Sequence, residues 1–203
     1  MAGENLLELA RKGVSLGLSI IPPKEDGSKQ PDGAWKTYQD RLPTEKELSR
    51  WFPPSRQGIG IVTGAISGNI EALDFDLWDI YEAFLKRGDE IGLGLLLRRI
   101  RDGYEEQTPR GAHLLWRCEK IAGNTRLAAD ASGQKALIET RGEGGFCIVA
   151  PSGGSVHQSG KSYLVRQGSW ATIPTITPEE RAALFALAQS FDQSPPRTEY
   201  IPK

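Results

Sequence analysis

The sequence has few cysteines and no long apolar stretch. Its two cysteines, Cys118 and Cys147, are too few and too far apart to form a disulfide framework or a zinc ribbon. No apolar run approaches the length of a membrane span, and Glu4 and Glu8 stand where a signal peptide would be basic and then apolar. We therefore expect a reduced, soluble, cytoplasmic protein with no structural metal and no membrane partner.

The chain also lacks an excess of positive charge, since its formal net charge is −1. This balance argues against a general nucleic-acid coat. The average hides a basic middle, because residues 98–170 hold 11 Lys and Arg against 7 Asp and Glu. These cations could meet a triphosphate or a template backbone, although an ordinary mixed-charge surface would give the same count. They include Arg110, Arg117, Lys135, Arg141 and Lys161.

Hydrophobic periodicity and capping signals predict a mixture of helices and strands. Helices are expected at residues 5–16, 44–51, 78–86, 90–101 and 177–191, with capping boxes opening the second and the last. Strands are expected at residues 18–21, 58–62, 70–76, 104–108, 112–118, 136–141, 145–150 and 162–166. Residues 193–203 hold three prolines and are interpreted as a linker. Four aromatic residues in apolar patterns are interpreted as core and not as base-stacking platforms: Trp51, Phe52, Trp116 and Phe146.

Two aspartates one residue apart end the strand expected at residues 70–76. Because side chains alternate along a strand, Asp74 and Asp76 would point to the same side and could bind hard divalent cations together. With a third carboxylate, such a site suits phosphoryl transfer through two metal ions. A solvated strand end or a cap would explain the same spacing.

Two further motifs follow the aspartate pair. Residues 108–113 read Thr-Pro-Arg-Gly-Ala-His and lead into an apolar strand, and residues 139–145 read Glu-Thr-Arg-Gly-Glu-Gly-Gly. With residues 58–76 before them and 155–163 after them, these motifs resemble the bifunctional primase-polymerase domain of the archaeo-eukaryotic primase superfamily. The resemblance runs from about Ile20 to Tyr163, with the segments in the family's order.

The resemblance implies an α/β chain of the α+β kind. In the family, an N-terminal α/β subunit packs on a C-terminal subunit whose antiparallel sheet is like an RNA-recognition motif. Carried over to this chain, the catalytic domain would span residues 1–192, with the first subunit at about 1–100 and the second at 101–192. The linker then suggests that the natural chain continues into a helicase or another replication domain, or meets one in trans.

The implied activity is template-directed nucleotidyl transfer by a DNA primase, a DNA polymerase or both. A 3′ hydroxyl would attack the α-phosphorus of an NTP or dNTP on a single-stranded DNA template or primer-template. Two Mg²⁺ or Mn²⁺ ions would activate the hydroxyl and neutralise the triphosphate. The implied metal ligands are Asp74, Asp76 and Glu139, and Glu139 stands where relatives usually carry aspartate.

The same resemblance implies the nucleotide-binding side chains. His113 would be a catalytic donor to the incoming nucleotide's phosphates, where it would stabilise charge on the leaving pyrophosphate. Thr108 and Arg110 would add donors in a turn that glycine lets approach phosphate closely. The set is completed by Arg141, Lys36 and His157, with Tyr163 near sugar or primer. A core histidine, a plain turn and an ion pair between Arg141 and Glu139 remain the structural alternatives.

Two other functions stay open. A non-catalytic nucleic-acid-binding module, such as a replication initiator, could keep the fold, but binding alone does not need carboxylates that face anionic DNA. Another metal-dependent phosphotransferase or a nuclease could use the carboxylates. A nuclease, however, does not need the triphosphate-binding turn at residues 108–113.

Overall fold

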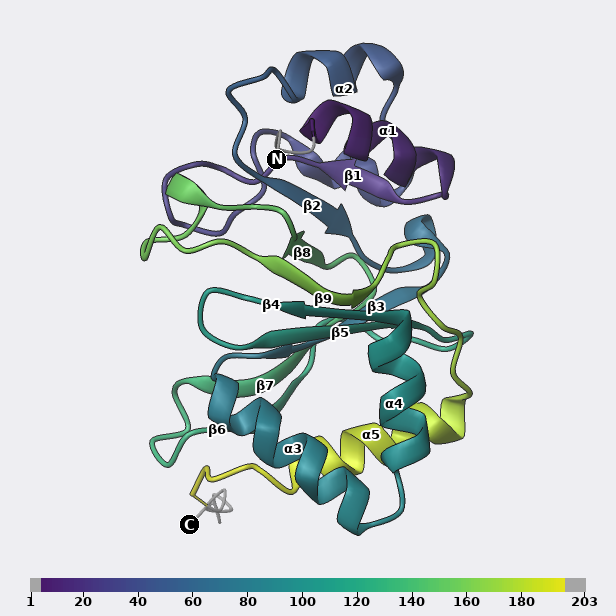
Figure 1. Ribbon diagram of the computed structural model, residues 1–203, viewed down its shortest axis with the longest axis vertical. Coiled ribbons are helices and arrows are strands. Elements are labelled where there is room, and N and C mark those ends of the chain that lie inside the picture. Colours follow the sequence, from purple (N-terminus) through teal and green to yellow (C-terminus); the bar gives the residue numbers. More distant parts are fainter. Residues whose placement is uncertain (1–4, 196–203) are drawn as a thin grey trace, which may run out of the picture.

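Antiparallel strands form two sheets in the computed structural model, which describes residues 5–195 (Figure 1). The small sheet has the order β1-β2-β8, with β1 at Ser19–Ile21, β2 at Ile59–Val62 and β8 at Phe146–Val149. The large sheet has the order β6-β7-β3-β5-β4-β9. Its strands are β3 (Ile70–Phe75), β4 (Tyr104–Gln107), β5 (Ala112–Arg117), β6 (Arg126–Ala129), β7 (Ala136–Arg141) and β9 (Leu164–Gly168). The fold is therefore α+β, in agreement with the predicted class.

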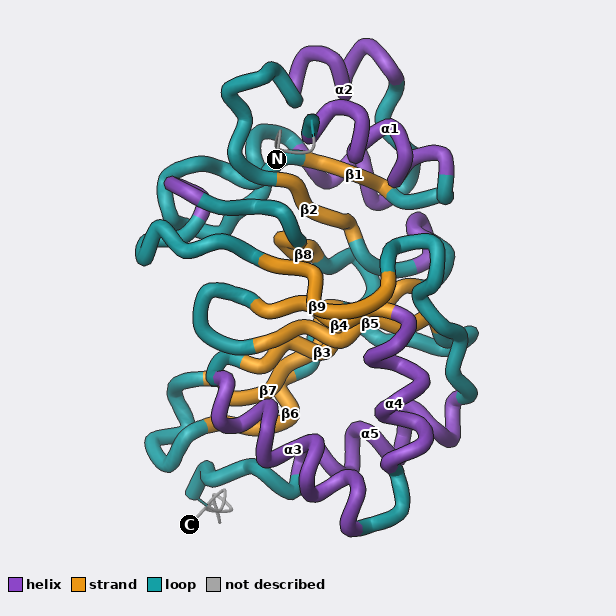
Figure 2. The backbone as a smooth tube through the Cα atoms, viewed as in Figure 1, coloured by secondary structure: helices purple, strands orange, loops and turns teal. Residues whose placement is uncertain are grey.

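Helices cover the outer faces of the two sheets (Figures 1 and 2). On the side of the small sheet lie α1 (Leu6–Ser15) and α2 (Glu45–Trp51), and on the far side of the large sheet lie α3 (Trp78–Glu90), α4 (Gly94–Gly103) and α5 (Pro178–Gln189). Short 3₁₀ turns occur at η1 (Trp35–Gln39), η2 (Ala65–Ser67) and η3 (Gly154–Val156). Among residues 5–195, no helix has the length and apolar character needed to cross a membrane.

Both predicted capping boxes are present. Thr44 accepts a hydrogen bond from the backbone N–H of Glu47, and the Glu47 carboxylate accepts the N–H of Thr44. Thr177 and Glu180 exchange the same two bonds at the start of α5. These reciprocal bonds satisfy amide groups that a helix start leaves unpaired, which is why both helices begin where the sequence predicts.

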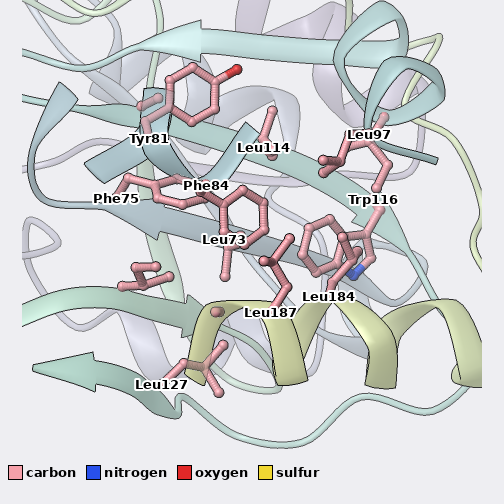
Figure 3. Packing of buried hydrophobic residues seen from close by; sticks show 14 of the residues in the cluster. Leu73, Phe75, Tyr81, Phe84, Leu97, Leu114, Trp116, Leu127, Leu184 and Leu187 are labelled. Atoms are coloured by element: carbon pink, nitrogen blue, oxygen red, sulfur yellow. The ribbon is translucent and has the colours of Figure 1, made fainter. Parts of the chain in front are cut away.

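The large sheet buries apolar side chains on both faces. On β3, Leu73 and Phe75 point toward the helices and join a core with Tyr81, Phe84, Leu114, Trp116, Leu184 and Leu187 (Figure 3). Ile70 and Ala72 belong instead to a second core, which the large sheet shares with the small sheet and α1. Because β3 side chains alternate, Asp74 follows Ala72 onto the face that looks toward the small sheet.

The structure differs from the predicted elements at three places. The helix expected at residues 78–86 continues to Glu90, and the next begins at Gly94. Gly88 lies inside the first of these helices. A Cβ at this position would lie 2.2 Å from Cδ1 of Leu97 on α4. The glycine thus permits close packing of two helices and does not end one. The short strand β6 was not predicted, because its four residues Arg-Leu-Ala-Ala include two alanines, which strands disfavour.

Both sheets combine strands from the two halves of the chain. β3 precedes residue 100 yet lies inside the large sheet, whereas β8 follows it and completes the small sheet. The boundary expected near residue 100 therefore does not separate the sheets. Of the predicted linker, residues 196–203 lie outside the described residues. As a result, β3 of the large sheet and β8 of the small sheet both contribute side chains to the space between the sheets.

Candidate active site

Strand register places the predicted acidic and basic residues in one row. β3 lies between β5 and β7, and Asp74 is directly opposite His113 on β5 and Glu139 on β7. Directly opposite residues of antiparallel strands point to the same face. Three residues that are far apart in the chain are thus brought together on the face turned to the small sheet.

Asp74 lies between two cationic side chains. Its Oδ1 atom is 3.2 Å from Nε2 of His113, and its Oδ2 atom accepts a hydrogen bond of 3.2 Å from Nη2 of Arg141. Arg141 also pairs with Glu139, as the structural alternative had it. Burial alone would raise the pKa of Asp74, but the charges and hydrogen bonds of His113 and Arg141 outweigh it and lower that pKa below its ordinary value.

The other two carboxylates behave in the opposite way. Burial and then the charge of Asp74 raise the pKa of Asp76 above its ordinary value. The pKa of Glu139 is also raised, because burial together with repulsion from Asp74 and Asp76 outweighs the attraction of Arg141. The three carboxylates therefore repel one another, and a cation placed among them would relieve the strain.

A carboxylate that the sequence analysis missed holds the other side of His113. Oε1 of Glu106 is 2.6 Å from Nδ1 of His113, so both ring nitrogens face carboxylate oxygens, an arrangement that favours the protonated imidazolium. Burial by itself lowers the pKa of His113, but the Cys147 sulfur and the Asp74 carboxylate raise it, and the result lies well above the ordinary value. The sequence held a signal for Glu106: a tight turn after Gln107 pairs Glu106 with His113 across the β4–β5 hairpin.

The turn at residues 108–111 is packed against the end of β3. Oγ1 of Thr108 accepts hydrogen bonds from the N–H groups of Gly111, at 2.9 Å, and Arg110, at 3.3 Å. A Cβ on Gly111 would lie 1.9 Å from the carbonyl oxygen of Phe75, so this close approach requires glycine. Thr108 therefore shapes the turn, and the turn sets Arg110 beside the carboxylates.

These side chains surround a cavity of about 210 Å³ between the two sheets. Eight of the nine predicted site residues line it: Asp74, Asp76, Thr108, Arg110, His113, Glu139, Arg141 and His157. Tyr163 also lines it, with its ring 6.1 Å from that of His113. The ninth, Lys36, does not: it lies exposed on η1. Lys29 lines the cavity without having been predicted, from a loop position with a positive φ of 59°.

The wall of the cavity that faces the carboxylates is positive. Lys29, Arg110 and His157 line the same cavity, and burial and then the charges of Lys29 and Arg110 lower the pKa of His157. Phe146 contributes an apolar part of the lining and stands 6.3 Å from the ring of Trp35. Its interpretation as a core residue is therefore incomplete, whereas Phe52 and Trp116 are buried as predicted.

The carboxylates have the chemistry of a metal site but are not arranged as one. Within residues 5–195, no group of three or more His, Cys, Asp and Glu side chains could hold a metal ion as placed. The Arg141 guanidinium instead pairs with both Asp74 and Glu139. Carboxylate oxygens are the ligands that hard divalent cations prefer, so the donor chemistry of Asp74, Asp76 and Glu139 suits such an ion.

The α+β scaffold thus brings Asp74, Asp76 and Glu139 into one cavity with Lys29, Arg110 and Arg141. The family described as bifunctional DNA primase/polymerase, N-terminal, matches residues 9–180, and the chain belongs to this family. The family is one of nucleotidyltransferases, which bind nucleotides and nucleic acid. A comparison with curated proteins found no match.

Proposed function

We propose that the protein is a template-directed nucleotidyltransferase, a DNA primase or DNA polymerase that transfers a nucleotide from an NTP or dNTP to a 3′ hydroxyl. One observation carries the proposal: a single cavity joins three carboxylates, Asp74, Asp76 and Glu139, to the cations Lys29, Arg110, Arg141 and His113. Nucleotidyl transfer needs both kinds of group: carboxylates hold the metal ions that bind the phosphate oxygens, and cations stabilise the leaving pyrophosphate.

The acidic end of the cavity is proposed to hold the metal. Asp74, Asp76 and Glu139 would be the ligands of two Mg²⁺ or Mn²⁺ ions, which when bound activate the attacking hydroxyl and neutralise the triphosphate. Arg141 would leave the carboxylates for the phosphates, since its guanidinium can form the same paired hydrogen bonds with phosphate oxygens.

The basic end is proposed to hold the triphosphate. The Nε2 atom of His113 faces Asp74 and would donate to a phosphate oxygen when a metal takes the Asp74 carboxylate. Arg110 and Lys29 would add charge, with Thr108 and His157 as further polar contacts. Lys36 is left out, because its side chain does not line the cavity.

The partners proposed are a single-stranded DNA template or primer-template and, further along the chain or in trans, a helicase or another replication domain. The large sheet with α3, α4 and α5 would correspond to the subunit like an RNA-recognition motif. A purely DNA-binding module has no use for the acidic row beside the cavity, and a nuclease does not need the triphosphate-binding turn at residues 108–113.

The decisive test is an extension assay with the purified chain. Single-stranded template, Mg²⁺ or Mn²⁺ and labelled triphosphates are incubated with and without a primer, and Asp74→Asn serves as the inactive control. Elongated products that depend on triphosphates and on Asp74 support the proposal. Release of nucleotides from labelled DNA in the absence of triphosphates would instead identify a nuclease.

A further inference from the structure

A second hollow of about 450 Å³ adjoins the cavity and is here named the Lys135 hollow. Its lining comes from the end of β3, the turn at residues 108–111 and the start of β7: Asp76, Leu77, Arg110, Asp130, Lys135, Ala136 and Leu137. Asp76 and Arg110 line both spaces. The Lys135 hollow therefore begins at the acidic end of the cavity.

The backbone around this hollow is held by hydrogen bonds. The N–H of Asp76 donates to the carbonyl of Leu137 at 3.0 Å, and the N–H of Trp78 donates to the carbonyl of Arg110 at 2.9 Å. Gly111 packs against the carbonyl of Phe75 in the same place. The three segments that form the walls are thus tied to one another, and the hollow is part of the scaffold.

The cations of the hollow are available to a ligand. Within residues 5–195, neither Arg110 nor Lys135 belongs to an ion pair, whereas Arg141 is engaged by two carboxylates. The Asp130 carboxylate is occupied within the β6–β7 turn, where it accepts a hydrogen bond of 2.6 Å from the Ser132 hydroxyl and one of 3.3 Å from the N–H of Lys135. An anionic group can therefore approach Lys135 without displacing a partner.

The remaining lining is apolar. Leu77 is 39% exposed, and its neighbours Asp76 and Trp78 are held by backbone hydrogen bonds. Leu137 and Ala136 complete the apolar part of the lining. Besides the two carboxylates, the hollow therefore offers Lys135 and an apolar surface, since Arg110 is assigned to the triphosphate. This combination matches a nucleotide within a strand, which offers a phosphodiester to Lys135 and a sugar and base to the leucines.

We propose that the Lys135 hollow binds the 3′-terminal nucleotide of the DNA strand that is extended, with its phosphodiester near Lys135. The inference rests on the proposed function. Asp76 decides between the two strands, because it stands on the wall shared with the cavity. Only the growing strand must present its terminal hydroxyl at that wall, next to the α-phosphorus of the incoming nucleotide.

Binding without catalysis tests the proposal. A fluorescent primer-template is titrated with native protein and with Lys135→Ala in the presence of a chelator and without triphosphate. We expect Lys135→Ala to weaken binding about threefold to tenfold and to reduce the slope of log Kd against log salt by about 0.7 to 0.9, the loss of one phosphate contact. Lys46→Ala is the matched control, since Lys46 is exposed on α2 and lines neither space.

A neutral linkage identifies the strand. A primer whose last phosphodiester is a methylphosphonate should bind native protein more weakly than the normal primer, but Lys135→Ala should bind the two alike. A template with one methylphosphonate opposite should leave the effect of Lys135→Ala unchanged.

Two results would overturn the inference: unaltered binding by Lys135→Ala, or an effect of Lys135 that disappears with the modified template instead of the modified primer. Both results are independent of catalysis. Failure of the proposed function would give a different result: native protein would extend no primer, while the contact between Lys135 and the primer end would still be measured.

Discussion

Glu106 lies directly opposite His113 in the β4–β5 pair, and its Oε1 atom is 2.6 Å from Nδ1 of the histidine. The carboxylate is fully buried, and its Oε2 atom accepts hydrogen bonds from the Tyr104 hydroxyl at 2.7 Å and from the N–H of Ala150 at 2.8 Å. Glu106 is thus fixed by β4 and by the end of β8. It fixes the imidazole in turn, with Nε2 directed at Asp74.

Glu106→Gln should impair catalysis through His113. The amide keeps the size of the carboxylate, but its NH₂ group must face at least one of the three donors that Glu106 now accepts. We expect kcat for primer extension to fall about tenfold to a hundredfold, as when other residues that orient a functional histidine are replaced. Tyr104→Phe is the control, because it leaves the contact between Glu106 and His113 intact. Equal losses in the two variants would mean that Glu106 serves packing alone.

His113→Ala and Arg110→Ala should differ in their effect on the free energy of unfolding. The family resemblance assigns both to phosphate binding, but the structure buries His113 between two carboxylates and leaves Arg110 exposed. His113→Ala should lower the free energy of unfolding by about 3 to 5 kcal/mol, since it leaves buried carboxylates without their partner. Arg110→Ala should change it by less than about 0.5 kcal/mol. Both should raise the KM for triphosphate in extension assays, and urea unfolding gives the stabilities.

A stable His113→Ala protein would show that the buried bridge contributes nothing to folding. An Arg110→Ala protein with an unchanged KM would remove Arg110 from the triphosphate site. The two outcomes are independent, because the side chains contact different groups.

Alternation along one strand could be predicted, but register between strands could not. The period of two predicts that Asp74 and Asp76 share a side. It does not say that β5 and β7 flank β3, and this order alone sets His113 and Glu139 opposite Asp74. The family resemblance supplied these residues without their contacts. Arg141 was assigned to phosphate, with an ion pair to Glu139 as the alternative, and the structure adds its contact with Asp74.

Loops explain the remaining differences. Lys29 reaches the cavity from a segment between β1 and η1 that has no hydrophobic period, so no pattern could predict its position. Lys36 was assigned by resemblance, yet the 3₁₀ turn η1 leaves it exposed. Such positions depend on how a loop closes over the sheets, and local sequence does not encode that closure.

Triphosphate binding should depend on divalent metal. Without it, three carboxylates line the cavity that the polyphosphate enters, and Arg141 is held by two of them. Calorimetry of an unreactive nucleotide analogue should therefore show clear binding with Mn²⁺ and little with a chelator. Equal affinity under both conditions would contradict the proposed site. Arg141→Gln gives a second readout: Mn²⁺ alone should bind more tightly, because the competing guanidinium is gone, while the analogue binds more weakly.

Asp74→Asn and Asp76→Asn should have the same effect on activity and opposite effects on stability. Each removes a proposed metal ligand, so each should reduce primer extension by about a thousandfold or more. A carboxyl whose pKa is lowered on folding stabilises the protein above its unfolded pKa, about 3.9, and loses that contribution as pH falls. Asp74 is such a group, because His113 and Arg141 outweigh its burial. Asp74→Asn should therefore lower the metal-free melting temperature at pH 7.

The charge of Asp76 has the opposite effect on stability. Its pKa is raised by burial and by Asp74, so its charged form destabilises the folded state at pH 7, and neutralising it should raise the metal-free melting temperature. In both variants the stabilisation that native protein gains from Mn²⁺ should disappear by linkage. Scanning calorimetry with a chelator and with Mn²⁺ measures the melting temperatures of native protein and both variants. Two variants that shift the metal-free temperature in the same direction would show that Arg141 and His113 do not hold Asp74 as the structure indicates, whereas a retained Mn²⁺ shift would remove the replaced aspartate from the metal site.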